Sequence, residues 1–280
     1  MDESGLQQVG SRLEQKLADN SLQLPMLPQV TSDVLSLVND VDSDAASLSK
    51  IIQSDQALAG HVMRIANSAA YSPTAKMTSL QQAIARLGMQ NISEIAMAAS
   101  LGPKMVSAPA FEDMVGQLWR YSLAVALWSR EIARERRSNV ESAFLAGLLF
   151  QIGNPVVLQA SLEISQALNL ECTVEDADQL MNHFGAQVGA SLAKSWQLPS
   201  AVHETIVHID TPNDSSATDV VETVRAGKVF AQITVGDRNY DAESLVKASD
   251  IIEVNLYAAD VAGLLEKTDK VHETLEALSL

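Results

Sequence analysis

The stretch that decides the fold is LPMLP at residues 24–28, followed by QSDQALAGHVMRIANSAAYS at 53–72 and TSLQQAIARLGMQNISEIAMAASL at 78–101. Apolar residues in the second and third parts recur at steps of three and four, which places them on one face of an α-helix. These residues are Leu58, Val62, Ile65 and Ala69, then Leu80, Ile84 and Leu87, then Ile92, Ile95 and Ala99. Consecutive helices with narrow apolar faces predict a helical bundle.

Local signals predict where these helices begin and end. Asp55 lies just ahead of the second apolar series, where its carboxylate can accept hydrogen bonds from the free N–H groups of a first helical turn. Gly88 interrupts the third part and is typical of a helix C-terminus. Upstream, Thr31 or Ser32 is expected to cap the helix that follows the prolines of LPMLP.

The rest of the chain also has helical spacing. Thr173 and Asp176 have the spacing of a capping box, and the helix that they begin carries Gly185 and Gly189 on a stripe that permits close helix contact. Further helices are predicted at residues 113–136, 141–150, 155–168 and 199–208, with two or three more after a loop at 211–217 and a turn at 236–241 between them. The sequence therefore predicts an all-α protein.

The three opening parts together resemble the N-terminal half of an HDOD domain. The shared motifs are LPxLP at Leu24–Pro28, D-x-AL…R-x-ANS-x-x-Y at Asp55–Tyr71, and TSL-x-x-AI-x-x-LG at Thr78–Gly88. HDOD domains are all-helical modules of bacterial signalling proteins, related to the HD phosphohydrolases. The resemblance covers most of the chain and implies two packed helical subdomains, of which the second is HD-like.

Proline and glycine positions suggest how the chain is divided. Residues 1–21 are expected to form a polar leader helix, 22–105 the N-terminal helical subdomain and 106–280 the C-terminal HD-like subdomain. The joint is placed at residues 102–113, which contain two prolines and a glycine. The leader has sparse apolar positions at helical spacing, so it can pack on the domain or meet a partner; both alternatives stay open.

Composition limits the classes of partner. The chain has 19 basic and 35 acidic residues, a net charge of −16, which disfavours binding to nucleic acid or to anionic membranes. The basic run at residues 130–137 alternates with glutamates and is predicted to be a solvated helix face. A single cysteine, Cys172, an N-terminus without an apolar core and the lack of an apolar run of membrane-spanning length favour a cytoplasmic protein.

The resemblance also permits a test for metal chemistry. HD phosphohydrolases bind their metal with histidines, a His-Asp pair and a later aspartate, which lower the pKa of a bound water. The corresponding positions of this chain hold Tyr121, Phe150, Gln151, Gly185 and Lys228, and one histidine of a later pair is retained as His208. The resemblance therefore implies that the chain has no metal site, no cofactor and no HD catalysis.

Two groups of residues remain as a candidate partner or effector surface. The first group is Arg64, Asn67, Ser68 and Tyr71, and the second is Trp119, Arg120, Gln151 and His208. For the first group the alternative is a structural role at a helix end. For the second, the former metal pocket is either open to an effector or filled by Tyr121 and Phe150.

Two functions from different classes follow. The first is a non-catalytic signalling or scaffold module that acts in trans on a protein partner with a basic face, or through a small effector. The alternative is a metal-dependent phosphohydrolase with non-standard ligands, while nucleic-acid binding is disfavoured by the charge. Apolar positions near the C-terminus can either close the core or form a dimer interface: Leu264, Leu265, Val271, Leu275 and Leu278.

Overall fold

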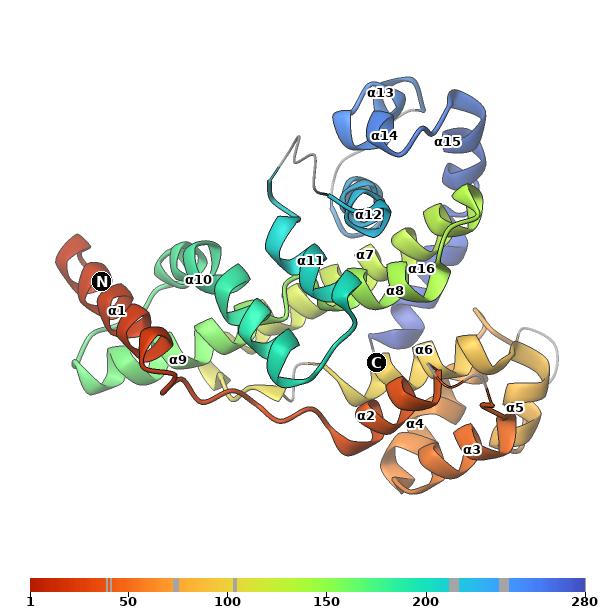
Figure 1. The fold of residues 1–280 in the computed structure, drawn as a ribbon, viewed down its shortest axis with the longest axis horizontal. Coiled ribbons are helices and arrows are strands. Elements are labelled where there is room, and N and C mark those ends of the chain that lie inside the picture. The colour runs from red at the N-terminus through yellow and green to blue at the C-terminus, as the bar shows by residue number, and fades with distance from the viewer. Residues whose placement is uncertain are drawn as a thin grey trace.

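The computed structural model describes residues 1–38, 40, 42–72, 76–102, 105–211, 217–236 and 242–279, and all regular structure in these ranges is helical (Figure 1). The predicted all-α class is therefore correct. Parts of the predicted joint at 102–113, of the loop at 211–217 and of the turn at 236–241 lie outside the described residues.

Five helices make up the N-terminal part of the fold. They are α2 (Gln29–Val38), α3 (Ala45–Gln53), α4 (Gln56–Ala66), α5 (Leu80–Leu87) and α6 (Met89–Ser100). The Asp55 carboxylate accepts a hydrogen bond from the Leu58 N–H at 3.0 Å, and Gly88, with φ of +87°, separates α5 from α6. Both helix boundaries predicted from these two residues are confirmed.

The start of α2 differs from the prediction. Neither Thr31 nor Ser32 caps this helix, because the Pro28 carbonyl already accepts the Ser32 N–H at 3.1 Å and the helix begins at Gln29. Thr31 is instead buried inside the helix, and its hydroxyl lies 2.6 Å from that of Ser100 at the end of α6. The helix therefore begins directly after Pro28, earlier than the positions of Thr31 and Ser32 indicate.

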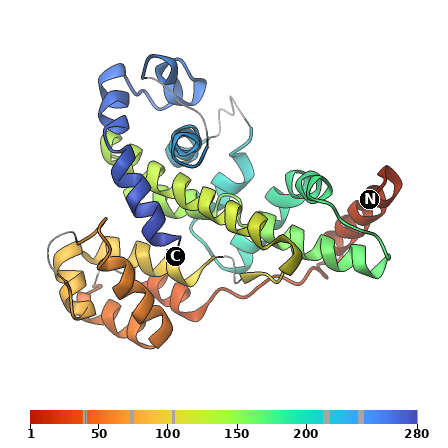
Figure 2. The same cartoon turned by 180° about the vertical axis from the view of Figure 1, so that it is seen from behind.

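The C-terminal part is organised around the long helix α7, which packs against α8, α12 and α16. Figure 2 shows α16 running alongside α7 from behind. The helices of this part are η2 (Pro109–Phe111), α7 (Glu112–Arg136), α8 (Val140–Leu149), α9 (Gly153–Ala167), α10 (Val174–Ser195), α11 (Ser200–His208), α12 (Asp219–Val235), α13 (Ala242–Val246), α14 (Ser249–Glu253), α15 (Ala258–Leu265) and α16 (Thr268–Leu278).

The number of helices after residue 217 was predicted too low. Five helices occupy this region, α12 to α16, because two short ones, α13 and α14, are divided by a turn at Lys247 and Ala248. Asn255, at a φ of 54°, then ends α14 before α15 begins. The apolar positions near the C-terminus close the core of the chain, since Leu264, Val271, Leu275 and Leu278 are all buried in it.

Small residues allow α9 and α10 to lie very close together. A Cβ atom added to Gly153 would lie 2.1 Å from the Gly185 carbonyl oxygen and 2.5 Å from the Gly189 nitrogen. The predicted close helix contact is therefore confirmed. The capping box of Thr173 and Asp176 that was expected at the start of α10 is also present.

The N-terminal helix α1 (Glu3–Ala18) packs on α9 and α10, at the far end of the molecule from α3 and α5 (Figure 1). Val9 and Leu13 on its apolar face are fully buried in the common core. Of the two alternatives for the leader, the structure therefore supports packing on the domain.

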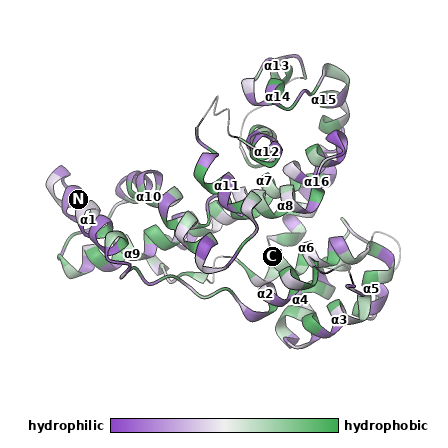
Figure 3. Ribbon diagram, in the orientation of Figure 1, coloured by the Kyte–Doolittle hydropathy of each residue, from purple (hydrophilic) through white to green (hydrophobic). Residues whose placement is uncertain are grey.

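One apolar run corrects the expectation that no segment reaches membrane-spanning length. An 18-residue window within residues 140–167, which form α8 and α9, has the length and hydropathy of a span, with a mean hydropathy of 1.5. Of this window, 78% is buried inside the protein, as is typical of a core helix. Figure 3 shows that hydrophobic and hydrophilic residues are mixed along most of the helices.

Candidate functional site

Three of the positions that the resemblance assigns to the metal ligands of HD enzymes converge in this structure. Tyr121 lies on α7, Phe150 directly follows α8, and Lys228 lies on α12. The Tyr121 and Phe150 rings contact edge to face with centroids 6.0 Å apart, and the Lys228 ammonium lies 5.6 Å from the Phe150 ring centroid. Apolar and aromatic contacts thus occupy the volume where the resemblance places metal ligands.

The charges around this cluster, formed by Tyr121, Phe150 and Lys228, also differ from those of a metal site. The Lys228 ammonium donates to the Asp210 carboxylate at 2.6 Å, at the exposed edge of the cluster. Burial, together with the negative charge of Asp210, raises the pKa of Tyr121 to about 12. The phenol of Tyr121 is therefore neutral at physiological pH, and the only cation in the cluster is covalently part of the chain.

Asp210 is held in place by a residue that the sequence reading did not single out. The buried guanidinium of Arg225, on α12, donates to the carbonyls of His208 at 2.6 Å and Ile209 at 3.2 Å, and also to that of Thr211. It thereby fixes the C-terminal end of α11 next to Lys228. Its position in the predicted helix after residue 217 gives no signal of this role.

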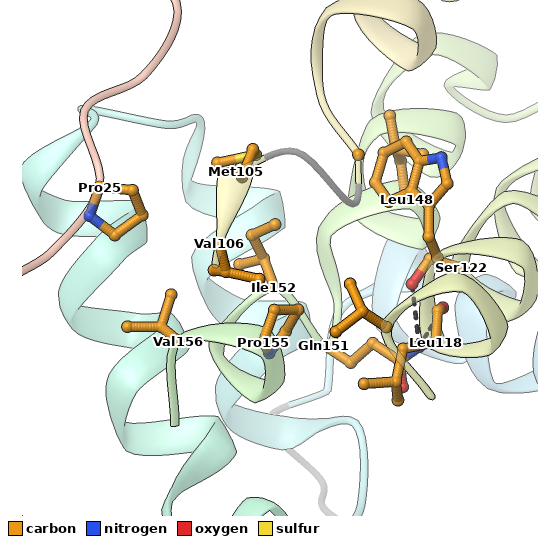
Figure 4. Close-up of a pocket in the computed structure, with 13 residues that line it drawn as sticks. Pro25, Met105, Val106, Leu118, Ser122, Leu148, Gln151, Ile152, Pro155 and Val156 are labelled. Atoms are coloured by element: carbon orange, nitrogen blue, oxygen red, sulfur yellow. Dashed lines mark hydrogen bonds between the residues drawn. The ribbon is translucent and has the colours of Figure 1, made fainter. Parts of the chain in front are cut away.

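Gln151 stands at the position of the HD aspartate and makes a structural contact. Its Nε2 donates to the Leu118 carbonyl at 2.8 Å and to the Ser122 hydroxyl at 2.9 Å, which ties the α8–α9 turn to α7 (Figure 4). A small apolar cavity of about 20 Å³ adjoins this contact. Its walls are mostly aliphatic side chains, among them Pro25, Val106 and Val156, and Trp119 of α7 also lines it.

The remaining positions of the HD pattern lie elsewhere. Gly185 faces Asn154 in the contact of α9 with α10, where a Cβ atom would lie 2.0 Å from the Asn154 Oδ1 atom. His208 is the last residue of α11, and its carbonyl is bound by Arg225.

The donor set does not fit a divalent metal. Phe150 has no lone pair to donate, Lys228 would repel a cation, and Tyr121 is protonated. Within the described ranges, no three His, Cys, Asp or Glu side chains lie close enough to hold an ion. No catalytic step through a metal is therefore derived for this site.

The first group of candidate surface residues is only partly on the surface. Asn67 caps α4 and joins it to the next segment, because its amide nitrogen donates to the Met63 and Met77 carbonyls and its oxygen accepts the Met77 N–H at 2.6 Å. Ser68 has its hydroxyl enclosed by protein. The contacts of Asn67 match the structural alternative, whereas the enclosed Ser68 hydroxyl has no hydrogen-bond partner within the described ranges.

Arg64 and Trp119 are brought to one groove. Arg64 lies with His61 along α4, and the groove continues past Ser100 to Trp119 on α7. The LPMLP segment forms its rim, anchored by a hydrogen bond of 2.9 Å from the Trp196 indole to the Pro25 carbonyl. Met26, between the two prolines, is 89% exposed. This groove, from Arg64 to Trp119, is called the LPMLP groove below.

Arg120 makes a different contact. It pairs with Glu276 of α16 at 2.5 Å, so it ties α16 to α7 rather than contributing to the groove. The pair is partly exposed to solvent. Although Arg120 follows Trp119 in the sequence, the two side chains make different contacts, because consecutive helix residues point about 100° apart.

A buried charged cluster was missed by the sequence reading. Arg130 on α7 is 5% exposed and binds Glu94 of α6 at 2.9 Å and Glu131 at 3.3 Å. Arg130 also hydrogen-bonds the Tyr71 phenol, whose pKa is raised by burial. The prediction that residues 130–137 form a solvated face is therefore wrong for its first residues, because Arg130 and Glu131 are buried and Arg130 pairs with Glu94 of α6.

The cluster extends to the C-terminal helices. Glu131 accepts from Arg134 at 2.6 Å and lies 3.3 Å from the Lys267 ammonium, just before α16. Although burial opposes it, these cations and Arg130 hold the pKa of Glu131 below its ordinary value. A charged residue within an otherwise apolar helix is the one signal in the sequence that could have indicated a buried ion pair.

Comparison with known proteins identifies the family. The model of the HDOD domain matches residues 24–212, which is more than half of the chain. The chain therefore belongs to the HDOD domain family.

A curated relative and several solved structures are similar over most of the chain. The relative is an uncharacterized protein of Treponema pallidum (strain Nichols), 23% identical over 241 residues, which are 82% of this chain and 45% of the relative. The chain thus spans less than half the length of that relative.

Two solved structures have a TM-score of 0.72. One is a "Putative metal-dependent phosphohydrolase" from Shewanella amazonensis SB2B, at 22% identity over 99% of this chain and 98% of its own. The other is an HDOD domain protein of unknown function from Geobacter sulfurreducens, at 20% identity over 95% of this chain and 99% of its own. A third, a "Putative signal transduction protein" from Marinobacter aquaeolei VT8, has a TM-score of 0.65 at 18% identity, over 98% of this chain and 66% of its own. At these identities the likeness establishes the fold.

Proposed function

We propose that this HDOD protein is a non-catalytic regulatory module of bacterial signal transduction that acts in trans, in the cytoplasm, by binding a protein partner. The observation that carries the proposal is the cluster of Tyr121, Phe150 and Lys228, in which packed rings and a fixed ammonium occupy the metal positions of HD enzymes. A site without metal ligands has no route to the metal-bound water that HD hydrolysis needs.

The LPMLP groove is the surface proposed to bind the partner. Met26 is 89% exposed at its rim, and the half-buried Trp119 provides apolar surface within it. Methionine and tryptophan are enriched in protein interfaces because they bury much area with little rotamer cost or adapt to the partner's shape. The net charge of −16 supports a partner with a basic face, since such a partner is steered towards an acidic surface.

The alternative function, a phosphohydrolase with non-standard ligands, is tested by metal content and turnover. Purified protein is incubated with Mn²⁺, Fe²⁺ or Zn²⁺, analysed for bound metal after desalting, and assayed with a generic phosphodiester. The expected result is substoichiometric metal and no turnover. Stoichiometric metal with turnover that is lost in His208→Ala would overturn the non-catalytic proposal.

The groove is tested by capture of cellular proteins with variants of the intact chain. Met26→Asp is expected to abolish capture of a specific partner without affecting the melting temperature, because the side chain is exposed. Ile252→Asp is the matched control, since Ile252 is also a large exposed apolar residue, on α14. Equal loss in both variants, or retention by Met26→Asp, would exclude the groove as the binding surface.

A further inference from the structure

A second concave site lies where the N-terminal helices meet the C-terminal ones. It is a cavity of about 100 Å³ between α2 and α6 on one side and α8 and α11 on the other, which has room for a small ligand. Small-molecule sites often form where two structural units meet. The site is separate from the LPMLP groove and from the Tyr121 cluster, with which it shares no lining residue.

The body of this cavity is apolar. Leu35 and Val38 of α2, Leu145 of α8 and Val202 of α11 contribute aliphatic side chains to its walls. A ligand that fills it must therefore present a short aliphatic surface, because a polar body would lose its hydration without compensation.

One face of α6 supplies most of the polar groups. Gln90, Ser93 and Glu94 line the cavity at three- and four-residue spacing. The Glu94 carboxylate is already bound at both oxygens, by Arg130 at 2.9 Å and by the Gln90 amide at 3.2 Å. The Ser93 hydroxyl, by contrast, is enclosed and has no hydrogen-bond partner in the described part of the chain. An enclosed hydroxyl without a partner is a cost that a bound polar group would remove.

Glu141 provides a carboxylate that no described residue neutralises. It lies at the mouth of the cavity in the first turn of α8, and no salt bridge to it is formed among the residues described. Burial, and then the charge of Glu94, raises the pKa of Glu141. The α8 N-terminus does not require this carboxylate as a cap, because the Asn139 side chain already accepts the Ser142 N–H at 2.9 Å.

We infer that this cavity binds a small aliphatic amine, with its ammonium between Glu141 and the Ser93 hydroxyl and its carbon chain along Leu35, Leu145 and Val202. An ammonium donates three hydrogen bonds, and its positive charge would neutralise the Glu141 carboxylate. An organic cation fits better than a metal ion, since no three metal-type side chains come together in the described ranges. This inference does not depend on the partner surface proposed above.

The test uses methyl NMR on protein labelled at Ile, Leu and Val, titrated with n-hexylamine, 1-hexanol and hexanoate. These probes have the same chain length and differ in charge. Hexylamine is expected to shift the methyl signals of Leu35, Val38, Leu145 and Val202 and to bind at least tenfold more tightly than hexanol, with hexanoate weaker still.

Two variants distinguish the site from general charge effects. Glu141→Gln is expected to weaken hexylamine at least tenfold and to remove its advantage over hexanol. Glu175→Gln is the matched control, because Glu175 is also an exposed first-turn carboxylate, on α10, and this variant should bind as the wild type does. Equal binding of the three probes, methyl shifts confined to other residues, or unchanged hexylamine affinity in Glu141→Gln would overturn the inference.

Discussion

Two regions of the molecule differ from what their sequences suggest: one has fewer charged contacts than expected, and the other has more. The HD-like cluster of Tyr121, Phe150 and Lys228 lies at a position where related enzymes hold charge, yet it is held together by ring contacts. Between α6 and α7, by contrast, lies the buried ion pair of Glu94 and Arg130. The comparison indicates that the strongest electrostatic constraint in this chain acts between its two parts and not at the former metal site.

The physical difference between the regions is exposure. The Lys228–Asp210 pair at the edge of the cluster is open to water on the Asp210 side, so solvent screens it. Both partners of the Arg130–Glu94 pair are shielded from water, so losing one partner leaves the other charged and unsolvated. The predictions below test this difference, beginning with the largest expected effect.

Arg130→Met should cause the greatest loss of stability. The substitution leaves Glu94 buried without its cation, and breaking a buried pair in this way costs roughly 3–5 kcal/mol. Urea denaturation followed by circular dichroism measures the change. Arg134→Met is the control, because Arg134 is partly exposed and its loss should cost less than about 1 kcal/mol. Equal effects of the two variants would mean that the buried pair is not the stronger constraint.

Gly185→His, which restores a histidine of the HD pattern, should destabilise the protein by roughly 1–3 kcal/mol, because the added side chain overpacks the contact of α9 with α10. The change is measured in the same urea experiment, with Gln187→His on the exposed face of α10 as the control. If Gly185→His were as stable as the wild type and bound Mn²⁺, the α9–α10 contact would be able to accept a metal ligand.

Tyr121 should make stability depend on pH in the alkaline range. Its folded-state pKa, about 12, lies above the ordinary tyrosine pKa of 10.0, so the folded protein holds this proton more tightly than the unfolded chain does. The resulting stabilisation is complete below pH 10 and is lost as the pH rises from 10 towards 12. Tyr121→Phe should therefore lose less stability than the wild type over this window, by roughly 1–2 kcal/mol. Parallel curves for the two proteins would contradict the buried, neutral phenol.

Lys228→Met should have the smallest effect on the free energy of unfolding, less than about 1 kcal/mol. The Lys228–Asp210 ion pair is open to solvent, and the methionine side chain can still cover the Phe150 ring. Thermal denaturation with Asp210→Asn as the companion variant measures it. A loss of several kcal/mol from Lys228→Met would show that the former metal site keeps a strong electrostatic role.

Features that depend on neighbouring residues could be predicted from the sequence. Asp55 and the pair of Thr173 and Asp176 form hydrogen bonds three residues away, so a short motif contains both partners. The replaced metal positions were assigned from motif order through the resemblance, and this assignment stays a prediction. Helix class, most boundaries in the first 210 residues and the close contact at Gly185 were all accessible in this way.

Features that depend on distant residues could not be predicted. Arg130 and Glu94 are 36 positions apart, and nothing in the run at 130–137 shows that α6 will cover it. Asn67 binds Met77 across ten positions, and Arg225 binds the end of α11 across sixteen or more. The start of α2 was missed for a related reason, because the buried contact of Thr31 with Ser100 uses the hydroxyl that a cap would need.

A pair of double-mutant cycles tests the central comparison most directly. One cycle combines Glu94→Met with Arg130→Met, and the other combines Asp210→Asn with Lys228→Met, with unfolding free energies measured by urea denaturation for every variant. The account predicts a coupling energy of more than about 2 kcal/mol for the buried pair and less than about 1 kcal/mol for the pair at the former metal site. Equal couplings, or a larger one for Lys228 and Asp210, would contradict it.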